Sequence, residues 1–149
     1  MPPPPTAAAI QSVRAVYAEL ALRPLQRACS GLAECCRFRL TGRTPFLTRG
    51  EALVAAAAWR AAGRSTLPRP ADGACPLLAA NGRCQIYEGR PFGCRTHFCT
   101  AAGGPYARGE VRDLIQQLET LDSQLGGNGA VNLPVALEHA MAATTRRMR

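Results

Sequence analysis

Cysteine is the residue type with the clearest chemical potential in this 149-residue chain. Seven cysteines form two groups, which are Cys29, Cys35 and Cys36, then Cys75, Cys84, Cys94 and Cys99. Cysteine thiolates bind zinc and iron–sulfur clusters, and pairs of thiols form disulfides. The second group lies within 25 residues that contain two prolines and three glycines and show neither helical nor strand periodicity. We therefore expect an irregular segment that is held in place by whatever its thiols bind.

Metal binding is the favoured explanation of this pattern. The odd number of cysteines and an N-terminus without a basic, secretory-type start disfavour structural disulfides. Seven clustered thiols are also too many for a set of small buried apolar residues. A structural metal contributes about 10–16 kcal/mol, which offsets an ordering cost of roughly 1–2 kcal/mol per residue. All seven cysteines are therefore predicted metal ligands.

The identity of the bound metal stays open between an iron–sulfur cluster and zinc. A structural zinc needs four tetrahedral ligands, and seven thiols exceed that number. The closest non-adjacent pair is Cys94-x4-Cys99, and such wide, irregular spacing favours the iron–sulfur cluster. His97 lies between these two cysteines. It is either an eighth ligand, or a non-ligand side chain that faces solvent or contacts the ligands. The second role is favoured, because the thiols already exceed the need of one site.

Arginine supplies all the positive side chains of the chain, whose formal net charge is +8. The absence of lysine excludes a P-loop lysine and Schiff-base chemistry. Arg37, Arg90 and Arg95 flank cysteines, where they would stabilise the negative charge of a thiolate cluster or serve as ordinary surface residues. The arginines are dispersed, and no aromatic residues interleave with them, so a solvated surface is favoured over a nucleic-acid groove.

The N-terminal residues also bear on location. They do not resemble a secretory signal, and no apolar stretch reaches the length of a membrane span. We therefore expect no membrane association and a cytoplasmic protein, in which thiols stay reduced and serve metal or redox chemistry.

Four helical stretches are predicted to position the cysteines, with little or no sheet, so the fold class is mainly α. The expected helices run from residue 6 to about 22, from about 49 to 62, from about 111 to 125, and onward from Asn132 as a cap with Pro134 in the first turn. Thr48 and Glu51 form a capping box before the second helix, and Gly126 with Gly127 ends the third. Residues 1–5 read as a proline-rich tail and residues 6–149 as a single domain.

The cysteine pattern resembles a known family. Cys-Cys-Arg at 35–37, Cys-Pro-Leu-Leu at 75–78, and Cys84-x-Ile-Tyr-x2-Arg-Pro-x2-Cys94-Arg-x3-Cys99 are similar to the YkgJ-like cysteine-cluster family over about residues 29–99. The resemblance implies a zinc- or iron-chelating domain. The same pattern is similar to part of the flagellin lysine methylases, for which it implies an iron–sulfur cluster. Members of the family commonly carry the pattern C-x2-C-x2-CC, with two cysteines before the double cysteine. This chain departs from it, because only Cys29 precedes the double cysteine.

Three functions follow as hypotheses. The leading one is a metal-binding protein with a cysteine-ligated iron–sulfur cluster, in electron transfer, redox sensing or metal handling. The second is a zinc-stapled interaction module whose arginine-rich surface binds an acidic protein partner or nucleic acid. The third is an enzyme related to the iron–sulfur lysine methylases, although no glycine-rich nucleotide motif or acid–base pair is evident.

Overall fold

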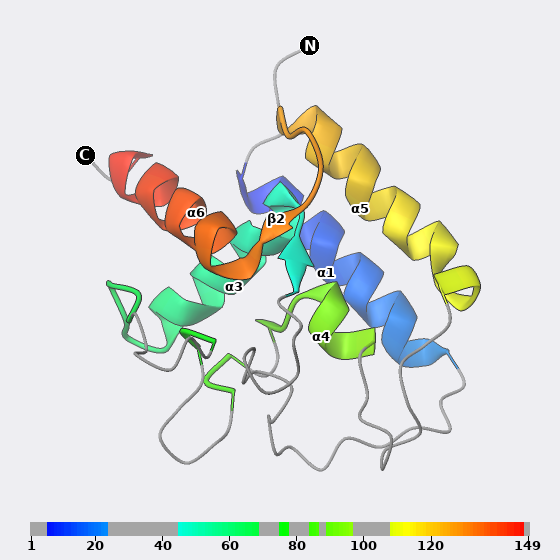
Figure 1. Ribbon diagram of the computed structural model, residues 1–149, viewed down its shortest axis with the longest axis horizontal. Coiled ribbons are helices and arrows are strands. Elements are labelled where there is room, and N and C mark those ends of the chain that lie inside the picture. Colours follow the sequence, from blue (N-terminus) through cyan, green and yellow to red (C-terminus); the bar gives the residue numbers. More distant parts are fainter. Residues whose placement is uncertain are drawn as a thin grey trace.

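The computed structural model describes residues 6–23, 45–68, 75–77, 84–86, 89–96 and 108–147. As predicted, this part of the chain is mainly helical (Figure 1). Its elements in order are α1 (Thr6–Leu22), β1 (Phe46–Leu47), α3 (Arg49–Ala61), α4 (Phe92–Thr96), η4 (Arg108–Glu110), α5 (Arg112–Gln124), β2 (Val131–Asn132) and α6 (Leu133–Arg147). The four long helices confirm the predicted ones to within about two residues, and the short helix α4 was not predicted.

Helix α1 forms where the apolar spacing predicts it. Val13, Tyr17 and Leu20 recur at three- and four-residue steps and are all buried. They pack against α3 and α5. The helix ends at Leu22, two residues before Pro24, because proline disfavours helical backbone in the residue that precedes it.

Helix α3 lies at the centre of the bundle and contacts α1, α5 and α6. Its capping box is present as predicted: Thr48 accepts a hydrogen bond from the backbone of Glu51, and Glu51 accepts one from the backbone of Thr48. A second carboxylate also binds this helix start. Asp122 of α5 is buried and accepts hydrogen bonds from the backbone N–H groups of Arg49, at 2.8 Å, and Gly129, at 3.0 Å. No signal in the local sequence indicates this role of Asp122.

The last two helices also follow the sequence. Helix α5 ends at Gln124, and Gly126 adopts a positive φ of 83°, which glycine tolerates. Asn132 caps α6 through its side-chain oxygen, which accepts from the N–H of Val135 at 3.2 Å. Among the described residues the only sheet is the antiparallel pair β1–β2, in which Phe46 faces Asn132 and Leu47 faces Val131.

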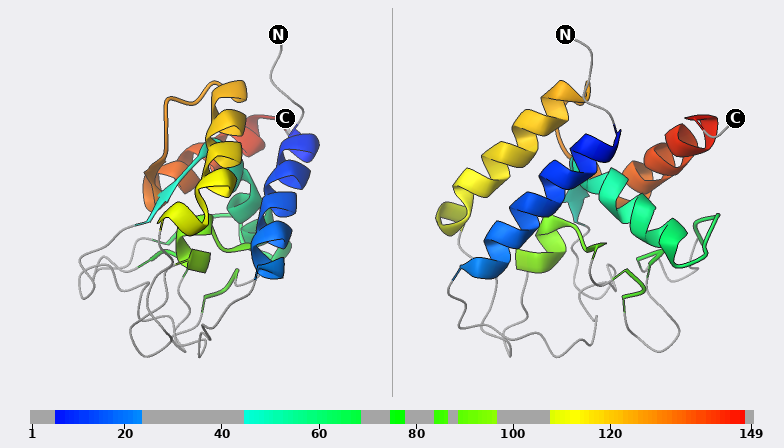
Figure 2. Two further views of the ribbon diagram at one scale, coloured as in Figure 1. Left: turned by 90° about the vertical axis from the view of Figure 1, so that its right-hand side faces the viewer. Right: turned by 180° about the vertical axis from the view of Figure 1, so that it is seen from behind.

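Two apolar clusters meet at α3. The first cluster joins α3 to α6, to β1 and to the described pieces of residues 75–99, which we call the cysteine segment. Trp59 and Leu137 are fully buried in this cluster. The second joins α3 to α1, α4 and α5, with Val13 and Leu114 at its centre. The views in Figure 2 agree that α1 and α5 lie side by side while α6 covers another side of α3. Helix α3 is therefore the central element of the fold, because it contributes side chains to both clusters.

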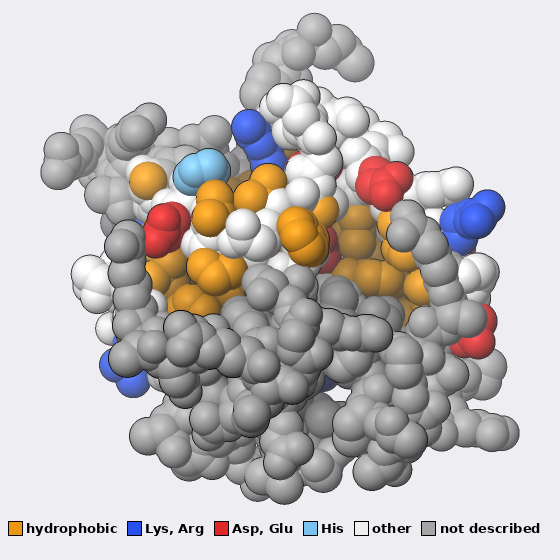
Figure 3. Space-filling model, viewed as in Figure 1, with side chains coloured by type: hydrophobic (Ala, Val, Ile, Leu, Met, Phe, Trp, Pro, Cys, Tyr) orange, Lys and Arg blue, Asp and Glu red, His pale blue; other side chains and the backbone are white. Residues whose placement is uncertain are grey.

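A few apolar side chains stay on the surface. Phe46 of β1, Val131 of β2 and Val135 of α6 are exposed, and apolar side chains are visible over these elements in the space-filling view (Figure 3). Among the helices of the described residues, none combines the length and apolar character that a membrane crossing needs.

Candidate metal centre

Three of the seven predicted ligands lie in the described part of the chain. Cys75 is buried, Cys84 and Cys94 are partly buried, and no two of these three described cysteines form a disulfide with each other. The remaining predicted ligands lie outside the described residues, as does His97; they are Cys29, Cys35, Cys36 and Cys99. The same holds for Arg37.

Cys75 and Cys84 lie against the first apolar cluster. Cys75 is 3% exposed and belongs to that cluster, and Cys84 packs against it. The backbone N–H of Gln85 donates to the carbonyl of Leu77 at 2.9 Å and so joins the two pieces of chain that carry these cysteines. Side chains of α3 and its following turn support them, since Arg64 donates to the Gln85 side chain at 3.1 Å and lies over the ring of Trp59.

Cys94 lies on α4, within the segment that was expected to be irregular. The helix begins after the buried Pro91, whose carbonyl accepts the N–H of Cys94 at 3.0 Å and that of Arg95 at 3.1 Å. Proline is common at the start of helices because its φ is already fixed near the helical value, so Pro91 was the available signal. Periodicity missed the helix because five residues hold too few apolar positions to show a repeat.

A close backbone approach seats the cysteine segment on α3. A Cβ built on Gly89 would lie 2.8 Å from the Cβ of Ala58, and the carbonyl of Val54 lies 3.8 Å away. Only glycine fits this contact without a shift of the helix. Ile86 thus packs in the first cluster, Gly89 lies against α3, and Phe92 packs in the second cluster.

Glu51 connects this segment to the bundle. Its side chain is 3% exposed and accepts hydrogen bonds from the Thr48 N–H at 2.9 Å, the Thr48 hydroxyl at 3.0 Å and the Phe92 N–H at 2.7 Å. The Tyr17 hydroxyl lies at hydrogen-bond distance, 3.5 Å. Burial raises the pKa of Glu51, and these hydrogen bonds offset part of that shift. The carboxyl group thus does more than cap α3.

Arg95 lies over Tyr17 of α1. The guanidinium carbon is 4.1 Å from the ring centroid, which is a cation–π contact, and Nε donates to the carbonyl of Arg90 at 2.7 Å. Burial is the largest cause of a raised pKa of Tyr17, followed by the charge of Glu51; Arg95 acts in the opposite direction. Cys94 is also among the groups that raise this pKa.

The donor chemistry fits zinc or iron, because both accept thiolate ligands. Within the described residues, however, no group of three or more cysteine, histidine or acidic side chains comes close enough to hold a metal ion. Cys75, Cys84 and Cys94 therefore do not form a complete site by themselves. A site that uses them needs further ligands from outside the described residues.

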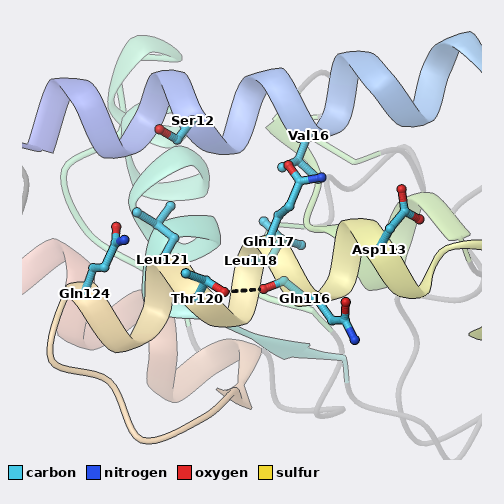
Figure 4. A pocket seen from close by; sticks show the side chains of 9 residues that line it. All are labelled: Ser12, Val16, Asp113, Gln116, Gln117, Leu118, Thr120, Leu121 and Gln124. Carbon is cyan, nitrogen blue, oxygen red and sulfur yellow. Dashed lines mark hydrogen bonds between the residues drawn. The ribbon is translucent and has the colours of Figure 1, made fainter.

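A separate hollow of about 360 Å³ lies between α1 and α5, and none of the described residues that line it is a cysteine (Figure 4). Amide and hydroxyl side chains share its lining with a few apolar ones, and the residues are Ser12, Val16, Asp113, Gln116, Gln117, Leu118, Thr120, Leu121 and Gln124. The hydroxyl of Thr120 already donates to the carbonyl of Gln116 at 2.9 Å. Among the described residues that line it there is no group of metal ligands.

Comparison with known proteins gives one match. The model of the family named CxxCxxCC, described as "putative zinc- or iron-chelating domain", matches residues 28–120, which is more than half of the chain. No curated protein and no solved structure matches. Laid on the chain at Cys29, the spacing in the family name coincides with Cys35 and Cys36 and places Leu32 where the second cysteine would stand.

Proposed function

The chain belongs to the CxxCxxCC family of zinc- or iron-chelating domains, and on that premise we propose that its metal is an iron–sulfur cluster. Some thiolates would come from the chain that packs against α3 and from α4, at Cys75, Cys84 and Cys94. The others would come from Cys29, Cys35, Cys36 and Cys99. A cluster of this kind serves electron transfer, redox sensing or metal handling. The protein is proposed to act in one of these roles.

The observation that carries the proposal is the number and placement of the thiols. Seven cysteines exceed the four ligands of a structural zinc. Cys75 and Cys84 lie at the first apolar cluster, whereas Cys94 lies on α4, whose first residue Phe92 is buried in the second, so these thiols come from separate segments rather than from one tight turn. Ligands spread over separate segments suit a multi-iron cluster, which is wider than a single ion. Arg95 follows Cys94 directly and would offset the negative charge of thiolate ligands.

The test is anaerobic purification followed by a visible spectrum and metal analysis. We expect a coloured protein with broad visible absorption, bound iron and acid-labile sulfide, and loss of the colour in air. A colourless protein with stoichiometric zinc and no reducible chromophore would refute the cluster. Neither iron nor zinc at any significant occupancy would refute the proposed metal-binding role itself.

A zinc-stapled interaction module is the second candidate. The family description includes zinc, and the lack of long secondary structure in the described pieces of the cysteine segment is typical of regions held by a structural ion. In that case the arginines would face an acidic partner. Colourless protein with full zinc occupancy is the result that would favour this candidate.

A further inference from the structure

We propose that Glu51 is the positioning residue of the metal centre, because it fixes the helix that carries Cys94 by accepting the N–H of Phe92. The inference rests on the proposed metal-binding function and assigns part of its geometry to a residue outside the cysteine segment. Glu51 is not itself a predicted ligand. It acts through the backbone of α4.

The two oxygens of Glu51 have different partners. Oε2 accepts both hydrogen bonds from Thr48, which completes the capping box of α3. Oε1 faces the other elements, since it accepts the Phe92 N–H at 2.7 Å and the Tyr17 hydroxyl lies at 3.5 Å. A capping box requires only the first pair. The second oxygen is therefore available to join α3 to α4 and α1.

Helix α4 depends on such external contacts. It has five residues, and an isolated helix of that length is unstable in water. Phe92 is its first residue, and Cys94 follows two positions later. The Phe92 side chain is buried in the second cluster, so its N–H is also shielded from water, and an unpaired buried N–H is costly. The hydrogen bond to Glu51 therefore sets where α4 begins and how the thiol of Cys94 is presented.

Asp122 provides a matched control. It is as buried as Glu51, at 2% exposed against 3%, and it also accepts backbone N–H groups from two separate segments, at Arg49 and Gly129. Neither segment carries a cysteine. Substitution of either carboxylate by its amide leaves one of two backbone donors facing an NH₂ group, which cannot accept. The two substitutions are thus alike in chemistry, but only the one at Glu51 affects a hydrogen bond to α4.

The experiment uses the full, reduced chain loaded anaerobically with Co²⁺, whose thiolate charge-transfer bands report the ligands. We measure the rate of Co²⁺ release to excess EDTA and the urea midpoint of the metal-free protein for wild type, Glu51→Gln and Asp122→Asn. Glu51→Gln is expected to release Co²⁺ about tenfold faster, the lower end of the range for residues that orient metal ligands, and to shift the bands. Asp122→Asn is expected to release Co²⁺ at the wild-type rate, although both variants lower the urea midpoint.

A second variant covers the case in which Glu51→Gln does not fold. Glu51→Asp keeps a carboxylate in the first turn of α3 but is one methylene too short to serve both sets of donors, so it is expected to accelerate release as well. Equal release rates in wild type and both Glu51 variants would overturn the proposal, and so would equal acceleration in Asp122→Asn. If wild type shows no thiolate–Co²⁺ bands, there is no cysteine site for Glu51 to position and this inference falls, whereas the iron–sulfur proposal is decided separately by the iron and sulfide analysis of the purified protein.

Discussion

Arg95 is the charged side chain whose position bears most directly on the proposed cluster. It follows Cys94 on α4, and its contacts with the Tyr17 ring and the Arg90 carbonyl hold the guanidinium in one place. A fixed positive charge beside thiolates favours the more negative, reduced state of a cluster. Because the two contacts fix the guanidinium, its effect on the reduced state depends on where Arg95 lies and not only on its charge.

Substitution of Arg95 by Gln is therefore expected to lower the reduction potential of the cluster without preventing its assembly. Redox titration of the visible spectrum under anaerobic conditions measures the change. Arg14→Gln removes the same charge from an exposed position on α1 and is the control. An equal shift in both variants would show that net charge, and not the position of Arg95, sets the potential.

A second arginine gives a prediction about pH. Arg23, at the end of α1, donates to both carboxylate oxygens of Asp113 at the start of α5 and to the carbonyl of Glu110. These hydrogen bonds hold the pKa of Asp113 below its ordinary value of 3.8. A lowered folded-state pKa means that the ionised carboxylate stabilises the fold above pH 3.8, and that this contribution is lost as the pH falls through the folded-state pKa.

The Arg23→Gln variant should therefore be less stable than wild type above pH 3.8 and approach it below. Urea unfolding at pH values on both sides measures the difference. The effect should be small and should shrink with added salt, because Asp113 is on the surface. A difference that does not change with pH would contradict the assignment to this ion pair.

The sequence predicts a single residue's role best when the partner is near in the chain. The capping box of Thr48 and Glu51 spans three positions and is visible in the letters alone, as is the Asn132 cap. The bond from Phe92 to Glu51 joins residues 41 positions apart, and nothing in either local sequence indicates it. The buried role of Asp122 was missed for the same reason, because its donor Arg49 lies 73 positions away.

At the scale of elements, periodicity was a sufficient guide where a helix was long. Each of α1, α3, α5 and α6 has at least 13 residues and so repeats its apolar positions several times. Helix α4 is too short to repeat. The pair β1–β2 is also invisible to a period of two, because each strand has only two residues.

The junction of three helices leads to an element-scale prediction. Gly50 lies in the first turn of α3, where a Cβ would stand 2.8 Å from both a Leu121 methyl of α5 and a Val13 methyl of α1. Alanine would gain about 1 kcal/mol in helix propensity, but overpacking costs typically 1–3 kcal/mol. The buried neighbours leave little room for adjustment, so we expect the cost to exceed the gain.

Gly50→Ala is therefore expected to lower the free energy of unfolding by about 1 kcal/mol, measured by urea titration. Gly109→Ala is the control, since a Cβ there would meet no described residue within 4 Å. If Gly50→Ala proves more stable than wild type, the packing of α1, α3 and α5 at this point is looser than the contacts indicate.

At the scale of the whole molecule, two kinds of interaction hold different parts of the chain. The long helices bury apolar side chains in two clusters. The described pieces of the cysteine segment attach through a few contacts, such as Gly89 on α3 and Phe92 at Glu51. The metal was predicted to supply the rest of their stability. That residues 6–149 form one domain stays a prediction.

Removal of the metal is therefore expected to affect residues 64–108 first. Hydrogen exchange after chelation, or after oxidative loss of a cluster, should speed up at the backbone amides of Gln85, Cys94 and Arg95 while those of α1, α3, α5 and α6 stay protected. Unchanged exchange at these three amides would contradict a role of metal in holding the segment. Equal acceleration throughout the helices would show that the bundle itself depends on the metal.

The way α6 covers α3 also bears on the order of events during synthesis. All seven cysteines precede residue 100, whereas α6, which closes one side of α3, extends to Arg147. At translation rates of about 5–20 residues per second, the last thiol is made roughly 2–10 s before the end of that helix. During this interval the thiols can meet metal or oxygen while the α6-facing side of Trp59 is still uncovered. A nascent chain can thus acquire its metal before it has a closed core.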